Sequence, residues 1–238
     1  MKSIYNEILQ SKKFNQKLVA ILIDPDKIDL SKVEIVSNKI NQSLATHIFV
    51  GGSSFDGNHL DEIIIQLKLN IKLPIILFPG NPSQISDKAD GILFLSLISG
   101  RNPDYLIDHQ VNAVPTLKKT NLEIISTGYI LVESGKKTAV ELVSETKSLS
   151  KNNPNYILQT AQAGEMLGNK LMYLEAGSGA DLPISEEIIN LVSKNIKIPL
   201  IVGGGIRSLS EITKAQNAGA DLVVIGTAFE KNINFFKF

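Results

Sequence analysis

The segment Asn70-Ile-Lys-Leu-Pro-Ile-Ile-Leu77 returns later in the chain as Asn195-Ile-Lys-Ile-Pro-Leu-Ile-Val202, at an offset of 125 positions. The same offset relates Gly52-Ser53 to Gly177-Ser178. In both copies a short apolar run follows a proline, which is typical of a buried strand bounded by turn residues. A repeat of this kind indicates that the chain consists of two half-barrels whose strands correspond.

Eight short apolar segments alternate with helical patterns along the chain. The predicted strands are residues 18–24, 48–52, 74–78, 91–95, 122–132, 171–175, 199–203 and 221–225. Alternating strands and helices predict a parallel α/β sheet, and eight such units close a (β/α)8 barrel. We expect residues 1–238 to form one such domain, with a helix at residues 1–13 lying across one end. Ser31 and Glu34 have the spacing of a capping box, which predicts a helix start.

One unit of the barrel is too short to contain its helix. From Pro199 to Asp221 there are 22 positions, enough for a strand and a helix that Ser208 would cap. From Pro74 to Asp90 there are only 16. We therefore expect the helix after the third strand to be missing or reduced to a turn. The resulting gap in the outer ring could admit a long ligand from the side.

Composition excludes several classes of function. Lys and Arg together number 24, as do Asp and Glu, so no net field attracts nucleic acid or an anionic membrane. Without cysteine there can be no disulfide, thiolate metal site or thiol nucleophile. No apolar run reaches the ~20 residues of a membrane span, and residues 1–17 lack a secretion signal. We therefore expect a cytoplasmic protein without transmembrane segments.

The segment Tyr173-Leu-Glu-Ala-Gly-Ser-Gly179 combines a carboxylate with an anion-binding loop. Glu175 ends an apolar strand, and burying a carboxylate there is costly unless a cation pairs with it. Since no cation is adjacent in sequence, we expect Glu175 to be functional. Glycine-rich loops also follow the last two strands, at residues 203–207 and 226–228. Three neighbouring loops of this kind predict one phosphate site at the barrel's carboxyl end.

Asp24 and Ser53 follow the first two strands and are candidate Mg²⁺ ligands, because a hard cation prefers oxygen ligands. The alternative, that both only shape turns, has equal weight. Lys27 lies in a turn that is expected to be solvated. Tyr129 and Tyr173 either face the barrel mouth or pack inside it. Arg207 either reaches the phosphate or lies on the surface, and the three histidines are scattered and taken as structural.

Taken together, these motifs resemble the geranylgeranylglyceryl phosphate synthase family, which includes the bacterial heptaprenylglyceryl phosphate synthases. The resemblance covers nearly the whole chain in order. It rests on residues 22–27, 49–54, 77–82, 128–132, 173–179, 202–207 and 226–227. It implies a barrel that lacks the third outer helix. It also implies a Mg²⁺-dependent prenyltransferase that joins the 3-hydroxyl of sn-glycerol 1-phosphate to C1 of a polyprenyl diphosphate.

The resemblance also implies roles for single residues. Asp24 and Ser53 match the magnesium positions. For the implied reaction, physical reasoning has Glu175 take the proton of the attacking hydroxyl and the ring of Tyr173 stabilise the allylic cation. Leu22 stands where the heptaprenyl branch has Lys, which favours the second large branch and a geranylgeranyl donor. The glycerol-phosphate positions are matched by Tyr173, Leu174, Glu175, Ala176, Gly177, Ser178, Gly179, Gly204, Gly205, Gly226 and Thr227.

Two alternatives remain at this point. One is another phosphate-binding barrel enzyme, such as a sugar-phosphate isomerase, which would share the glycine loops but not need the gap in the outer ring. The other is a barrel that binds a phosphometabolite without turnover, against which the intact Asp24 and Glu175 argue. We expect a homo-oligomer and transient membrane contact for the lipid. The aromatic tail at residues 235–238 could serve as an interface, but a final helix that packs on the barrel is the favoured interpretation of it.

Overall fold

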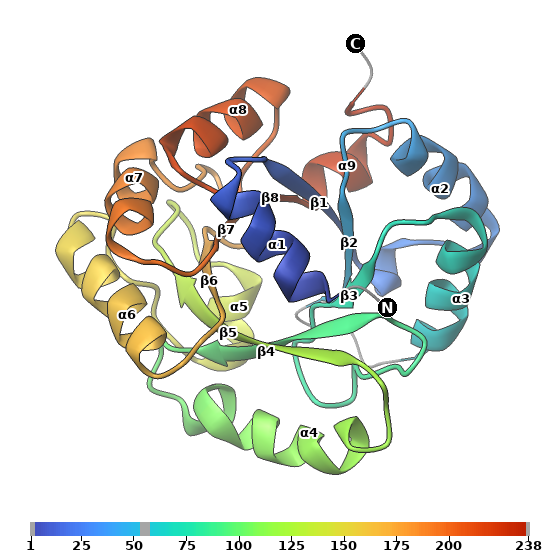
Figure 1. The fold of residues 1–238 in the computed structure, drawn as a ribbon, viewed down its shortest axis with the longest axis horizontal. Helices are drawn as coiled ribbons and strands as arrows, with labels where there is room; N and C mark the ends of the chain where they lie inside the picture. The colour runs from blue at the N-terminus through green and yellow to red at the C-terminus, as the bar shows by residue number, and fades with distance from the viewer. Residues whose placement is uncertain (1–2, 53–57, 237–238) are drawn as a thin grey trace.

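In a computed structural model, which describes residues 3–52 and 58–236, eight parallel strands form a closed barrel in chain order (Figure 1). The strands are β1 (Leu18–Ile23), β2 (His47–Val50), β3 (Ile75–Leu77), β4 (Gly91–Leu97), β5 (Glu123–Leu131), β6 (Leu171–Glu175), β7 (Leu200–Gly203) and β8 (Leu222–Ile225). The predicted barrel is confirmed. Every predicted strand is present, with ends that differ by two residues at most.

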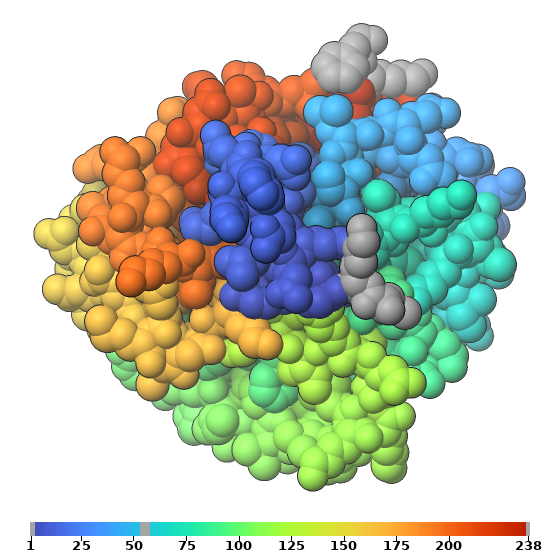
Figure 2. Space-filling model, viewed as in Figure 1, coloured from blue at the N-terminus to red at the C-terminus, as the bar shows by residue number. Residues whose placement is uncertain are grey.

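The helix α1 (Ile4–Lys13) covers one end of the barrel, as predicted (Figures 1 and 2). The Glu123 carboxylate at the start of β5 accepts hydrogen bonds from the backbone N–H of Ile4 and Tyr5, at 2.6 and 3.0 Å. Lys12, in the last turn of α1, forms an ion pair at 2.9 Å with Asp221, just before β8. Both anchors lie at the amino ends of strands, so α1 closes the end of the barrel opposite the expected site.

The sheet is surrounded by a ring of helices (Figure 1): α2 (Val33–Asn41), α3 (Leu60–Asn70), α4 (His109–Leu117), α6 (Pro154–Met166), α7 (Glu186–Asn195) and α8 (Leu209–Ala218). Two short helices, α5 (Ala139–Ser144) and α9 (Thr227–Lys231), lie inside this ring at the carboxyl end of the barrel. Ser208 caps α8 as predicted, accepting from the Glu211 N–H at 3.2 Å. The capping box predicted at Ser31 is wrong: Ser31 lies inside a short 3-10 turn (Leu30–Lys32), and α2 begins after it without a side-chain cap.

No helix forms between β3 and β4, where residues 78–90 are all described. The predicted absence of a helix after the third strand is confirmed. In the outer ring α3 is therefore followed directly by α4 (Figure 1). Because the segment is too short for a helix and its return, it runs as turns along the edge of the barrel mouth.

Two apolar layers hold the fold together. Alternate residues of each strand point into the barrel or out toward the helices, as the period of a strand requires. In β6, Leu171 and Tyr173 belong to the interior layer, whereas Met172 and Leu174 belong to the layer under the helices. This alternation directs Tyr173 and Glu175 to the same side of β6, into the barrel's carboxyl end.

Candidate active site

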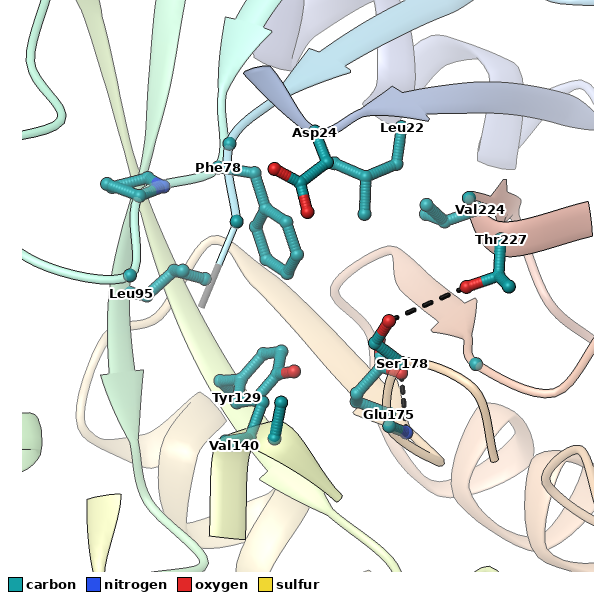
Figure 3. Close-up of a pocket in the computed structure, with 18 of the residues that line it drawn as sticks. Leu22, Asp24, Phe78, Leu95, Tyr129, Val140, Glu175, Ser178, Val224 and Thr227 are labelled. Atoms are coloured by element: carbon teal, nitrogen blue, oxygen red, sulfur yellow. Dashed lines mark hydrogen bonds between the residues drawn. The ribbon is translucent and has the colours of Figure 1, made fainter. Parts of the chain in front are cut away.

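A cavity of about 750 Å³ opens at the carboxyl end of the barrel. It lies between residues that follow or end the strands, including Asp24 after β1, Phe78 after β3 and Glu175 at the end of β6 (Figure 3). One side is apolar and is formed by side chains of β4, α4 and α5, such as Leu95 and Val140. The cavity therefore offers a polar floor beside an apolar wall, which suits an amphiphilic ligand.

Glu175 is the most deeply buried carboxylate of the cavity, with only 6% of the residue exposed. Its Oε1 accepts a hydrogen bond of 2.6 Å from the Gly177 N–H (Figure 3). None of the ion pairs between described residues involves it. Burial without a cation raises the pKa of Glu175 from 4.5 to about 7, against the opposing effects of the nearby Tyr173 hydroxyl and the Gly177 N–H. A carboxylate with a pKa near neutral pH is suited to accept a proton.

Aromatic rings line the cavity beside this carboxylate. Tyr173 is fully buried, and its ring centroid lies 5.2 Å from Tyr129 and 5.4 Å from Phe78, the latter in an edge-to-face arrangement. Burial raises the pKa of both tyrosines, and the Glu175 charge adds to this. The Tyr173 hydroxyl lies beside Glu175 without a hydrogen bond of ordinary geometry. Tyr129 and Tyr173 thus form part of the inner lining of the cavity.

The glycine loops after β6, β7 and β8 meet as expected. We call their cavity-lining residues the anion cup: Gly177, Ser178, Gly179, Gly204, Gly205, Gly226 and Thr227. The hydroxyls of Ser178 and Thr227 are 3.5 Å apart and join two of these loops (Figure 3). Gly204 has φ +81°, and a Cβ there would overlap the Glu175 Oε1, so only glycine fits. The cup therefore places exposed backbone and hydroxyl groups next to Glu175.

Asp24 lies across the cavity from the anion cup, where its carboxylate points into the open space (Figure 3). The backbone of Gly52, after β2, packs directly on this carboxylate, since a Cβ on Gly52 would come within 2.8 Å of Oδ1. The predicted metal ligand Ser53 lies outside the described residues. The described residues contain no group of three or more His, Asp or Glu side chains placed to hold a metal. A magnesium ion held by one carboxylate and by substrate phosphates needs no such group, so the site fits that ion.

Other predicted residues have different surroundings. The side chains of Leu174 and Ala176 point into the outer apolar layer and do not line the cavity, so their contact with an acceptor stays a prediction. Arg207 lines the cavity, but its guanidinium donates to the Ala180 carbonyl at 2.6 Å. Arg207 therefore braces the loop after β6 in this structure.

Among the cavity residues to which the sequence analysis assigned no role in the site are Phe78, Lys27 and Glu230. Phe78 follows β3 directly, and its strand-end position is the signal by which it could have been found. Lys27 is a half-exposed turn residue, as expected, but it also forms ion pairs with Asp24 and Glu230. Glu230 lies on α9, and only the docking of that helix brings it to Asp24.

Comparison with protein families matches residues 11–236 to the PcrB family. The chain belongs to the PcrB family. Among curated members, a geranylgeranylglyceryl phosphate synthase of Flavobacterium johnsoniae is 62% identical over 98% of this chain and 96% of that protein. One of Zunongwangia profunda is 50% identical over 97% and 98%. The resemblance seen in the sequence is thus confirmed at the level of the family.

Solved structures of PcrB relatives show the same barrel. That of (S)-3-O-geranylgeranylglyceryl phosphate synthase from Thermoplasma acidophilum, in complex with sn-glycerol-1-phosphate, has a TM-score of 0.93 at 32% identity, over 100% of this chain and 95% of that one. A tryptophan synthase alpha-subunit from Pyrococcus furiosus has a TM-score of 0.59 at 13% identity, over 91% and 89%, and shares the fold alone. Within the described part of this chain, no helix is long and apolar enough to cross a membrane.

Proposed function

We propose that this enzyme joins the 3-hydroxyl of sn-glycerol 1-phosphate to C1 of a polyprenyl diphosphate, with geranylgeranyl diphosphate as the donor and Mg²⁺ as cofactor. The observation that carries the proposal is a single cavity in which Glu175, of raised pKa, adjoins the anion cup while Asp24 faces it across an aromatic lining. The names of the curated relatives support the reaction.

The acceptor would bind at the anion cup. Glycine backbone and the hydroxyls of Ser178 and Thr227 can hold its phosphate, which needs local groups because the chain has no net charge. The glycerol carbons then extend toward Glu175. The relative from Thermoplasma acidophilum was solved in complex with sn-glycerol-1-phosphate, which supports this acceptor.

In the proposed prenyl transfer, the acceptor side and the donor side of the cavity have different roles. The hydroxyl oxygen forms a bond to C1 as the C1–O bond to diphosphate breaks, and Glu175 takes the hydroxyl proton. Positive charge that develops on the allylic carbon lies near the rings of Tyr173, Tyr129 and Phe78, which stabilise a cation. Asp24 would hold Mg²⁺, which neutralises the departing diphosphate when bound.

The apolar wall favours a prenyl donor over a small sugar phosphate. It extends from the aromatic rings along β4 to α4, next to the segment between β3 and β4 that has no helix. A sugar-phosphate isomerase would need no such wall. The donor's chain can leave the polar floor along this path, its burial contributing about 0.8 kcal/mol per methylene.

The assay uses labelled sn-glycerol 1-phosphate, Mg²⁺ and donors from geranyl to heptaprenyl diphosphate, followed by extraction with an organic solvent. We expect label in the organic phase, with most product from geranylgeranyl diphosphate. A chain that transfers no label with any donor would disprove the proposal, and a preference for heptaprenyl diphosphate would disprove the assignment to the second branch.

We further propose that residues 1–238 act as one domain in a homo-oligomer in the cytoplasm, with transient membrane contact when lipid enters or leaves. Exposed apolar residues such as Val111 on α4 and Leu142 on α5 support contact with another surface. Light scattering of the purified protein tests the oligomer, and vesicle flotation with and without donor tests the membrane contact.

A further inference from the structure

Lys27 connects the Asp24 side of the cavity to α9. Its Nζ lies 2.8 Å from Asp24 Oδ2 and 3.4 Å from Glu230 Oε2. The short turn Pro25–Lys27 positions it, since Lys27 N–H donates to the Asp24 carbonyl at 3.0 Å. All three side chains line the cavity, so two carboxylates share one ammonium there.

The Lys27 ion pairs are not needed to hold α9 against the barrel. The helix α9 is already held by Phe229, which is 2% exposed and packs against Phe236 at 6.3 Å. The Lys27 side chain is 50% exposed, whereas those of Asp24 and Glu230 are 15% and 19% exposed. Ion pairs this open to water contribute only about 0.2–1 kcal/mol. The contact is therefore weak enough to exchange with a ligand.

The position of Lys27 conflicts with a metal on Asp24. Oδ1 of Asp24 accepts from the Asp26 N–H at 3.2 Å, and Oδ2 is in contact with the Lys27 ammonium. A divalent cation that binds Oδ2 must displace Lys27. The ammonium then keeps Glu230 as its partner, and its flexible stem lets it reach another anion in the cavity. The diphosphate of the donor is the anion that the proposed reaction brings there.

We propose that Lys27 is an exchangeable counter-ion: it pairs with Asp24 in the free enzyme, leaves it when a divalent cation binds, and then binds the donor's diphosphate while Glu230 keeps it at the site. This inference rests on the proposed function, since only that function supplies a diphosphate. Binding of the cation and of the diphosphate are then coupled, each favouring the other.

Calorimetric titration without any prenyl donor tests the exchange. Lys27→Met should bind Mg²⁺ alone about two- to fivefold more tightly, because a competing ion pair of this exposure is gone. It should bind magnesium diphosphate about tenfold more weakly, since a charge-assisted contact is lost. Lys27→Arg, which keeps the charge, should retain most of the diphosphate affinity.

The matched control is Lys231→Met. Lys231 also lines the cavity and is exposed, but it forms no ion pair with a carboxylate of the described residues. The same loss of charge there should change both affinities less. Glu230→Gln should weaken Mg²⁺ binding, because Lys27 then pairs with Asp24 alone, and this effect should shrink in the Lys27→Met background.

Thermal unfolding of every variant shows whether it is folded. If Lys27→Met binds Mg²⁺ no more tightly than the wild type or the control variant, or if magnesium diphosphate binding is unaltered, the exchange is refuted. The result is independent of turnover. A chain that exchanges ions as described yet forms no prenylglyceryl product would refute the proposed function and leave the exchange standing.

Discussion

Replacing Glu175 with Gln should make the enzyme more stable at neutral and alkaline pH while removing most of its turnover. The carboxylate is buried without a cation, so its ionised form opposes folding. Glutamine keeps the carbonyl that accepts from the Gly177 N–H and adds an amide donor beside the Tyr173 hydroxyl, which lacks a hydrogen bond of ordinary geometry. The shape of the site is thus preserved while the charge is lost.

The magnitude follows from the pKa of Glu175, which burial raises from 4.5 to about 7. A tenfold change in proton affinity is worth about 1.4 kcal/mol, so the ionised residue costs roughly 3 kcal/mol of folding free energy above pH 7. Because the folded pKa is raised, the contribution of Glu175 to stability is most favourable below about pH 4.5, where the residue is protonated in both states. The wild type loses this contribution between pH 4.5 and 7, as the unfolded chain ionises first.

The assay is urea unfolding of the wild type and Glu175→Gln from pH 4.5 to 9. We expect little difference at pH 4.5, an increasing advantage of the variant up to pH 7, and a constant difference of roughly 3 kcal/mol above it, or roughly 6–10 °C in Tm. Turnover at pH 8 should fall about 10²- to 10⁴-fold with the loss of the base. A stability difference that does not change with pH, or a variant less stable at pH 8, would refute the proposed burial of an unpaired carboxylate.

The remaining predictions concern the same cavity. In the wild type, kcat/KM should rise with pH through a pKa of about 7 as Glu175 loses its proton, and a flat profile from pH 6 to 8 would exclude it as the base. Gly204→Ala should lower both turnover and stability, because the new Cβ would overlap Glu175 and lie 2.6 Å from the Gly177 nitrogen. Gly168→Ala is the control, since Gly168 has φ +94° but a Cβ there would meet no atom within 4 Å. It should lose about 1 kcal/mol of stability through backbone strain and keep full turnover. Asp24→Asn should raise the Mg²⁺ concentration needed for half-maximal turnover about tenfold or more, and an unchanged titration would remove Asp24 as the ligand.

Local patterns were sufficient for much of the fold. Strand positions depend on short apolar runs between turn residues, and the repeat at offset 125 required two similar halves. The absence of the helix could be predicted from the number of residues between Pro74 and Asp90, because so few residues cannot form both a helix and the connection back to the next strand. The helix start at Ser31 was wrong, since a preceding 3-10 turn displaces the beginning of α2.

For the candidate site, too, some features could be predicted from the sequence and others only from the tertiary structure. The sequence determined that a carboxylate and three glycine loops lie at strand ends, because parallel strands in a barrel bring their carboxyl ends to one face. Only the tertiary structure decided which groups touch: that Glu175 is buried without a cation, that Phe78 joins the two tyrosines, and that Lys27 lies between Asp24 and Glu230. Desolvation and ion pairing depend on every element packed around a group, and residues about 200 positions apart, such as Lys27 and Glu230, carry no local signal of their contact.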